Sequence, residues 1–303
     1  MRIITEDQVR ERLKIMEAFQ AVENSYRLFS QGKTIASPTT SMSVRSGMFY
    51  SFPAFIDGSP IFISKQATDY RDNSSRGLPT VHPYILVFDS ETGVLDSIIE
   101  GRYFAATRTA LSSAVGVKHL AKHPKRIAIF GTGVQGRSHV RVLSKLFPTI
   151  EEIRLFSPAS AHVEQAVSEL QSETSNVLIA ASSARDAVLD ADVIVTATSS
   201  KTPVFNHTDL KMGALVIGVG AMKNDQEIPT ETVSSSQVVV DALSNVVMYD
   251  EIRLAQNMNK NLKVLGEIGA LIDKNVKIHL GMTTIFKHHG LPVTDAALAE
   301  TLL

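Results

Sequence analysis

A glycine-rich stretch, "RIAIFGTGVQGRSHV" at residues 126–140, constrains the fold of this 303-residue chain more than any other feature. Four apolar residues at 127–130 are followed by Gly131, Gly133 and Gly136, in the spacing G-x-G-x-x-G. The apolar run predicts a buried strand, and the residues after the third glycine predict a helix. A strand that turns tightly into a helix in this way presents backbone N–H groups to an anion, so the stretch predicts a dinucleotide-binding site.

Each glycine of the motif has an expected role. The first allows the tight turn, the second lets the backbone approach a pyrophosphate, and the third lets helix and strand pack closely. The alternative is a tight strand-to-helix turn that binds no ligand. The surrounding sequence favours the nucleotide site, because the motif opens a strand-helix-strand unit.

Residues beyond 125 alternate between apolar runs and helical stretches. The predicted strands after the motif are "IEEIRLFS", "NVLIAAS", "DVIVTAT", "GALVIGVG" and "SQVVVDA", and helical segments separate the first ones. This alternation predicts an α/β fold with a parallel sheet and helices on both faces.

The residues before 125 have a different texture. The first 30 residues are predicted to be helical, with Thr5 and Gln8 spaced as a capping box. Residues 35–99 are rich in short β-branched and aromatic runs and predict antiparallel strands, with "DSETG" at 89–93 as a hairpin turn. A further helix is predicted at 106–122, and residues 283–303 are expected to form a loop and a helix.

Composition excludes several classes of function. The formal net charge is -1, which argues against nucleic acid or an anionic membrane as a partner. The chain has no cysteine, so it has no disulfide or thiolate chemistry, and no apolar run reaches the length of a spanning helix. His288 and His289 lack the spacing of metal ligands, and no metal is expected. We expect a cytoplasmic protein.

The choice between NADP and NAD depends on the end of the second strand of the nucleotide-binding unit. An acidic residue that binds the adenine ribose is expected there. The sequence at this point is "LFSPAS", residues 155–160, with no Asp or Glu. A 2′-phosphate would meet no repulsion, so NADP is favoured over NAD. The predicted cofactor-binding residues are Gly131, Thr132, Gly133, Val134, Gln135, Gly136, Ser157, Thr198 and Ser199.

Several ordered blocks together resemble the ornithine cyclodeaminase/μ-crystallin family. They are "SKQATDYRDNSSRGLPTVHPYILVFDSETG", "ATRTALSSAVGVKHLA", "IAIFGTGVQGRSHV", "DVIVTATSSKTPVF", "GVGAMKNDQEIP", "VVVDA" and "IFKHHGL". The resemblance covers nearly the whole chain, and it does not single out one substrate. Members of the family act at the α-carbon of an amino acid or its imine with a nicotinamide cofactor.

The resemblance also implies a domain arrangement. A Rossmann domain, residues 119–284, is inserted into a smaller α+β domain for substrate binding and dimerisation, residues 1–118 plus 285–303. The family implies a homodimer, with the substrate in the cleft between the domains.

The implied substrate is an α-amino, α-imino or α-keto acid, whose carboxylate needs a cation. Arg108 matches the family's carboxylate-binding arginine, and Lys65 matches its active-site lysine, which binds the carboxylate or exchanges a proton. Both are the predicted catalytic residues. The position of a second family arginine is held by Thr39, so Arg45 is the candidate to replace it. His82 is a further candidate for lining the substrate pocket.

One departure from the family pattern affects the expected reaction. Cyclodeaminases carry an aspartate shortly after a late strand, and the matching position here is Met222, with Asp225 as a candidate replacement. Cyclodeamination needs a proton handler at several steps, whereas simple imine reduction needs only a hydride and one proton.

The predicted function is therefore NAD(P)H-dependent reduction of a ketimine or α-imino acid, such as pyrroline-2-carboxylate, to an amino acid. Two alternatives stay open. One is an ornithine cyclodeaminase that forms proline and ammonia. The other, of a different class, is a crystallin-like protein that binds NADPH or a small ligand without turnover.

Overall fold

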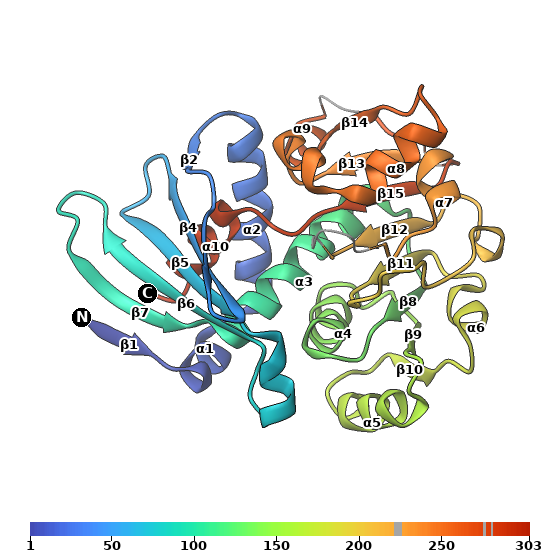
Figure 1. The fold of residues 1–303 in the computed structure, drawn as a ribbon, viewed down its shortest axis with the longest axis horizontal. Helices are drawn as coiled ribbons and strands as arrows, with labels where there is room; N and C mark the ends of the chain where they lie inside the picture. Colours follow the sequence, from blue (N-terminus) through green and yellow to red (C-terminus); the bar gives the residue numbers. More distant parts are fainter. Residues whose placement is uncertain (221–225, 275–276, 280) are drawn as a thin grey trace. The chain divides into compact units, whose positions relative to one another are not determined.

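The computed structural model describes residues 1–220, 226–274, 277–279 and 281–303. It divides into two compact units (Figure 1). Unit 1 contains both ends of the chain, Met1–Arg108 and Gly290–Leu303, and unit 2 is the intervening segment, Thr109–His289. The corresponding borders predicted from the sequence lie after residues 118 and 284.

Unit 1 contains a seven-stranded sheet in the order β1-β7-β6-β5-β4-β2, with β3 paired to β4. Strand β1 is parallel to β7, and the other pairs are antiparallel. The strands are β1 (Arg2–Ile4), β2 (Thr34–Ala36), β3 (Thr40–Val44), β4 (Gly47–Ile56), β5 (Ile61–Asp69), β6 (Val81–Asp89) and β7 (Leu95–Glu100).

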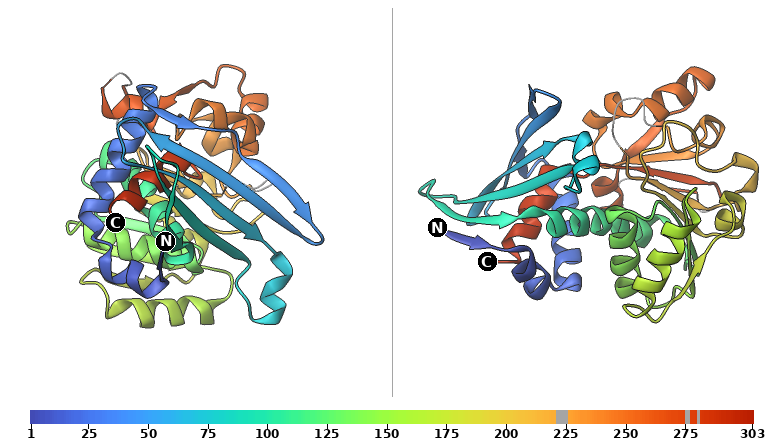
Figure 2. Two further views of the ribbon diagram at one scale, coloured as in Figure 1. Left: turned by 90° about the vertical axis from the view of Figure 1, so that its left-hand side faces the viewer. Right: turned by 60° about the horizontal axis from the view of Figure 1, so that its bottom comes forward.

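Helices cover one face of this sheet, as Figure 2 shows on the left, where the strands lie in front of α2 and α10. Helix α10 packs against α2 and against β4 and β5. The predicted capping box is confirmed, because Thr5 and Gln8 exchange hydrogen bonds at the start of α1. The helices are α1 (Glu6–Arg12), α2 (Ile15–Ser30), the 3₁₀ helix Arg71–Arg76, α10 (Pro292–Glu300) and the first part of α3 (Gly101–Leu120).

The predicted hairpin turn between β6 and β7 is also confirmed. Asp89 accepts a hydrogen bond from the backbone N–H of Thr92 at 2.8 Å. Gly93 has φ +71°, a conformation that favours glycine. The local turn chemistry therefore fixes the register of these two strands.

Alternation along β5 decides what its side chains contact. Ile63, Lys65 and Ala67 are buried and face the helices. Phe62, Ser64 and Gln66 point to the opposite face, because successive strand residues alternate. Lys65 is thus held on the apolar face of the sheet.

Unit 2 contains an eight-stranded sheet in the order β10-β9-β8-β11-β12-β15-β13-β14, with every pair parallel. Its strands are β8 (Arg126–Phe130), β9 (Glu152–Phe156), β10 (Val177–Ala180), β11 (Val193–Thr196), β12 (Leu215–Gly218), β13 (Gln237–Val240), β14 (Val264–Glu267) and β15 (Thr284–Lys287).

Helices pack on both faces of this sheet. Ala128 and Phe130 of β8 share a core with residues of α6, α7 and α8. Ile129 faces the other side, toward α4. The helices are α4 (Val134–Leu146), α5 (Ser160–Gln171), α6 (Ala184–Val188), α7 (Thr230–Ser234), α8 (Asp250–Met258), α9 (Ile268–Ile272), and the 3₁₀ helices His207–Asp209 and Leu243–Met248.

The strand order reverses between β8 and β11, and ligands bind at such a switch point in open α/β sheets. The predicted fold class is therefore confirmed: unit 2 has the Rossmann architecture, beside a separate α+β unit.

The expectation of a loop before the C-terminal helix is wrong, because β15 lies there. It pairs with β12 on one side and β13 on the other, and its four residues are buried. Phe286 packs so closely on α3 that a Cβ at Gly116 would lie 2.4 Å from its ring. Only Ile285 and Phe286 of this segment are apolar, so its sequence carries little strand signal, and pairing with the strands on either side defines it.

A buried polar network in unit 2 joins α3, α4 and the residue after β15. Nδ1 of His139 lies 2.7 Å from the carbonyl oxygen of Gln135, which only accepts, so Nδ1 donates. Nε2 of neutral His139 then accepts from the Ser113 hydroxyl at 2.8 Å. That hydroxyl in turn accepts from Nε2 of His288 at 2.8 Å. The network needs a neutral His139.

Burial lowers the pKa of His139 to about 4, although the hydrogen bond to Gln135 acts in the opposite direction. The unfolded chain takes up this proton near pH 6.5, whereas the folded chain resists until about pH 4. We expect acid to reduce the free energy of unfolding by roughly 2–3 kcal/mol between pH 7 and pH 4.5 through this group. Denaturant unfolding of the protein and of His139→Gln at both pH values measures it.

The variant His139→Gln should lose less stability on acidification than the wild type. The control is His162→Gln, at an exposed position on α5, which should keep the wild-type pH dependence. Equal pH dependence of all three proteins would contradict the assignment.

Candidate active site

Two glycines of the motif serve the packing of the chain itself. Gly131 has φ +99°, and a Cβ there would lie 2.4 Å from the carbonyl oxygen of Ala197. A Cβ at Gly136 would lie 1.9 Å from the carbonyl oxygen of Gly131. The N–H of Gly131 donates to Phe156 at the end of β9, at 2.9 Å. These contacts give the first and third glycines the structural roles that the sequence predicts.

Gly133 has a different environment. Nothing lies within 4 Å of a Cβ built on it, and its φ of -75° is ordinary for any residue. It is the N-cap of α4 and provides no side-chain hydrogen bond to the helix. The next residue, Val134, is 63% exposed. The first N–H groups of α4 thus border open space, which fits a pyrophosphate held by the backbone of residues 131–136.

The end of β9 lies beside this loop, since β8 and β9 pair from Arg126 to Phe130. Ser157 follows directly and is half-buried. Arg137, which follows the third glycine, donates to the carbonyl oxygen of Thr132 at 2.9 Å and pairs with Glu169. Its guanidinium therefore braces the glycine loop from within.

The loop after β11 is held by a buried carboxyl group that no motif in the sequence marks. Glu227 accepts from the backbone N–H of Thr198 at 2.6 Å and from its hydroxyl at 2.7 Å. Burial raises the pKa of Glu227, although Thr198 and Lys287 act in the opposite direction. Ser199, the next residue, is exposed.

A second buried carboxylate fixes the backbone of Glu227. Glu251 accepts from the N–H groups of Glu227 and Ile228 at 2.7 and 2.9 Å. Its other oxygen lies 2.6 Å from Nζ of Lys287, at the end of β15. No sequence pattern marks these residues, since their contacts join positions that lie at least 23 residues apart in the chain. Together they brace the carboxyl edge of the parallel sheet.

In unit 1, the structure brings Lys65 of β5 and Arg108 of α3 onto one carboxylate, Asp295 of α10. Nε of Arg108 donates to Oδ1 at 2.8 Å, and Nζ of Lys65 donates to Oδ2 at 2.5 Å. The exposed fractions are 8% for Lys65, 5% for Arg108 and 0% for Asp295. Nζ of Lys65 also lies 4.7 Å from the ring centroid of Phe52, across the strand pair. We call Lys65, Arg108 and Asp295 together the cation cluster.

Burial sets the acid–base state of the cation cluster. It lowers the pKa of Lys65 to about 8, with a further lowering from Arg108, while Asp295 opposes both effects. For Asp295, burial acts to raise the pKa, but Arg108 and Lys65 prevail and hold it below its ordinary value. The cluster therefore keeps an ionised aspartate between two cations, one of which titrates near neutral pH.

Asp295 was not predicted from the sequence. It lies in the first turn of α10, where an acidic residue is common for local reasons. Gly290, with φ +85°, gives the guanidinium its space, because a Cβ there would lie 1.5 Å from Nη1 of Arg108. The only sequence signal is therefore a glycine followed by a short helix.

Arg45 and His82 lie apart from the cation cluster. Arg45 is exposed in the turn between β3 and β4, with φ +55°. His82 pairs with Thr68, three residues after Lys65, so its side chain points to the opposite face of the sheet. Within the described ranges, no hydrogen bond or ion pair joins either residue to the cluster.

Met222 and Asp225 lie outside the described residues. In the part of the chain that the structure describes, no three His, Cys, Asp or Glu side chains are grouped as a metal site would require. In that same part, no helix is long and apolar enough to cross a membrane.

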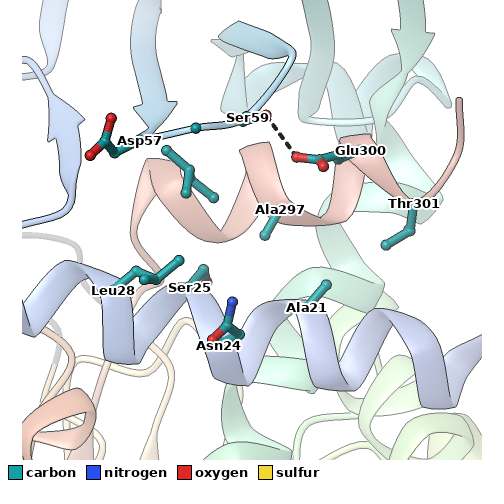
Figure 3. A pocket seen from close by; sticks show the side chains of 11 residues that line it. Ala21, Asn24, Ser25, Leu28, Asp57, Ser59, Ala297, Glu300 and Thr301 are labelled. Atoms are coloured by element: carbon teal, nitrogen blue, oxygen red, sulfur yellow. Dashed lines mark hydrogen bonds between the residues drawn. The ribbon is translucent and has the colours of Figure 1, made fainter.

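A cavity of about 400 Å³ lies elsewhere in unit 1, between α2, α10 and the turn after β4 (Figure 3). Ser59 donates to Glu300 at its rim, at 2.7 Å. Neither Lys65 nor Arg108 lines this cavity. Its position gives it no part in the candidate site.

Fold and site together define the class: a Rossmann-type dinucleotide-binding unit coupled in one chain to an α+β unit with a buried cation cluster. The family model of the ornithine cyclodeaminase/mu-crystallin family matches residues 2–302. The chain belongs to this family, as its sequence motifs predict.

Individual relatives are distant. An uncharacterized cyclodeaminase of Dictyostelium discoideum is 28% identical, over 84% of this chain and 78% of its own length. The ketimine reductase mu-crystallin of Mus musculus is also 28% identical, over 84% of this chain and 79% of its own. Among solved structures, the Thermococcus litoralis Delta(1)-pyrroline-2-carboxylate reductase with NADH and L-proline matches with a TM-score of 0.93. It is 24% identical and covers 100% of this chain and 96% of its own, which shows the shared fold.

Proposed function

We propose that this protein is an oxidoreductase that uses NAD(P)H to reduce a ketimine or α-imino acid, such as pyrroline-2-carboxylate, to an amino acid. The observation that carries the proposal is the cation cluster, in which a buried lysine and a buried arginine share one carboxylate. Relatives named ketimine reductase and pyrroline-2-carboxylate reductase support the same reaction class.

In the proposed reaction, the cation cluster binds and protonates the substrate, and the glycine loop binds the cofactor. A bound nicotinamide cofactor would supply the hydride that adds to the imine carbon. Arg108 binds the substrate carboxylate, because a guanidinium offers paired N–H donors that match the two oxygens of a carboxylate. Lys65 holds a proton for the imine nitrogen, and its pKa of about 8 suits transfer near neutral pH. One hydride and one proton convert C=N into CH–NH.

The cofactor preference follows from the end of β9. No acidic side chain occupies residues 157–160, so a 2′-phosphate would be accepted there and NADP is favoured over NAD. Ser157, Thr198 and Ser199 join the glycine loop as the proposed cofactor-binding residues. Arg137 is engaged with Thr132 and Glu169, which supports a bracing role for it.

A homodimer and a cytoplasmic location belong to the same proposal. The sheet face of unit 1 opposite the helices carries stacked Phe62 and Phe88, with ring centroids 4.9 Å apart, and half-exposed Tyr84. A cavity of about 320 Å³ adjoins it, lined by Ile35, Ser37, Pro53, Ala54, Phe55, Phe62 and Ser90. An apolar face of this kind supports burial against a second copy. The absence of cysteine accords with a reducing compartment.

The second candidate is cyclodeamination of ornithine, supported by the relative that is named a cyclodeaminase. It needs an acid–base group beyond Lys65, and the family's aspartate is replaced here by Met222. Asp225 is the candidate for that role. The third candidate is a protein that binds NADPH or a small ligand without turnover. It is less favoured, because it gives the buried Lys65 no role in a reaction.

Absorbance assays distinguish these functions. We expect oxidation of NADPH, and more slowly NADH, with pyrroline-2-carboxylate or piperideine-2-carboxylate, and no ammonia from ornithine. Ammonia and proline without net cofactor change would overturn the reductase proposal and assign a role to Asp225. Activity in neither assay would favour an acyclic imino or keto acid as the substrate, or a protein that binds its ligand without turnover.

A further inference from the structure

We propose that Asp295 is the positioning residue of the active site: it keeps Lys65 charged and oriented beside Arg108. This inference rests on the proposed function for its kinetic consequences, but its structural content stands on the cation cluster alone. Nothing in the sequence motifs assigns Asp295 a role, since it lies 230 residues from Lys65 and 187 from Arg108.

The carboxylate separates the two cations by giving each its own oxygen. Oδ2 takes the ammonium of Lys65, and Oδ1 takes the guanidinium of Arg108 through Nε. Two cations buried side by side repel each other, and an anion between them offsets that repulsion. The bridge therefore fixes both the charge and the spacing of the groups that would bind and protonate the substrate.

The hydrogen bond from Nε of Arg108 to Asp295 determines how the guanidinium is oriented. A guanidinium that is held through Nε has a fixed plane, so the orientation of its terminal nitrogens is set before a substrate arrives. Gly290 leaves room for Nη1, as no side chain larger than hydrogen fits there. Arg108 is thus oriented by Asp295 from one side and accommodated by Gly290 on another.

Asp295 itself acts only through the other two residues. Its side chain is fully buried and both of its oxygens are engaged. Its position in the first turn of α10 holds it rigidly, because α10 packs against both α2 and β5. It is therefore a positioning residue and not an acid or base of the reaction.

The isosteric variant Asp295→Asn tests the inference. Loss of the anion should lower the pKa of Lys65, so the alkaline limb of the kcat/KM profile should move to lower pH by about one unit or more. Selective ¹³Cε labelling of lysine, with Lys65 assigned by its loss in Lys65→Arg, measures the same shift without turnover. The control is Glu300→Gln, at the exposed end of the same helix, which should leave both titrations unchanged.

The outcomes separate the two proposals. No turnover of any imine by the wild type, with a lowered Lys65 pKa in Asp295→Asn, would refute the reductase function and support the positioning role. An unchanged Lys65 titration in Asp295→Asn would overturn that role. If Asp295→Asn does not fold, Asp295→Glu keeps the charge but displaces it, and kcat should fall at least tenfold with the alkaline limb retained. A wild-type kcat in Asp295→Glu would also overturn the inference.

Discussion

Lys65→Met should reduce kcat with a cyclic imine by about a thousandfold or more while leaving NADPH affinity within about twofold. Methionine fills the space of the lysine stem beside Phe52 but has no proton to give, and Asp295 keeps its pairing with Arg108. Steady-state kinetics at pH 7.5 and a fluorescence titration of NADPH measure the two quantities.

The matched control is Lys33→Met, an exposed lysine of the same unit, which should retain wild-type values for both. Turnover by Lys65→Met at the wild-type rate would remove Lys65 from the chemistry. A parallel loss of NADPH binding would mean that the substitution disturbs more than the cation cluster.

Gly136→Ala should lower the stability of the fold, whereas Gly133→Ala should weaken cofactor binding and leave stability unchanged. A methyl group at position 136 would lie 1.9 Å from the carbonyl oxygen of Gly131, so backbone must move. We expect a loss of roughly 3 kcal/mol or more in the free energy of unfolding, from overpacking at a backbone contact. Thermal or denaturant unfolding measures that loss.

A methyl group at position 133 meets no atom of the chain within 4 Å. Gly133→Ala should therefore keep wild-type stability, while it weakens NADPH binding about tenfold or more by occupying the space of the pyrophosphate. Unchanged affinity in this variant would place the pyrophosphate elsewhere. Wild-type stability of Gly136→Ala would show that the loop relaxes freely.

The parts of the fold that were predicted correctly are those whose signal is local. The apolar run of β8 and the glycines that follow it lie within about ten residues, so strand, turn and helix are all visible in the sequence. The same holds for the capping box at Thr5 and the hairpin turn at Asp89. Strand β15 has no such signal, because its central place depends on β12 and β13 on either side.

The candidate site was predictable only in part. Lys65 and Arg108 are visible through family resemblance, since their residue types alone are equally typical of a solvated surface. Asp295, Glu227 and Glu251 act through partners distant in the chain, and single-sequence patterns do not encode such pairings. His82 illustrates the converse: its nearness in sequence to the family motif gave no information on which face of the sheet it occupies.

The burial of Lys65 has a consequence for how the protein responds to its surroundings. Burial lowers the pKa of Lys65 to about 8, so a larger fraction of its side chains is uncharged near neutral pH than for an ordinary lysine in water. A small change of pH around the protein therefore changes the fraction of molecules that hold a proton on Lys65. The apolar packing that buries Lys65 in unit 1 thus makes the charge of this side chain depend on the pH of the medium.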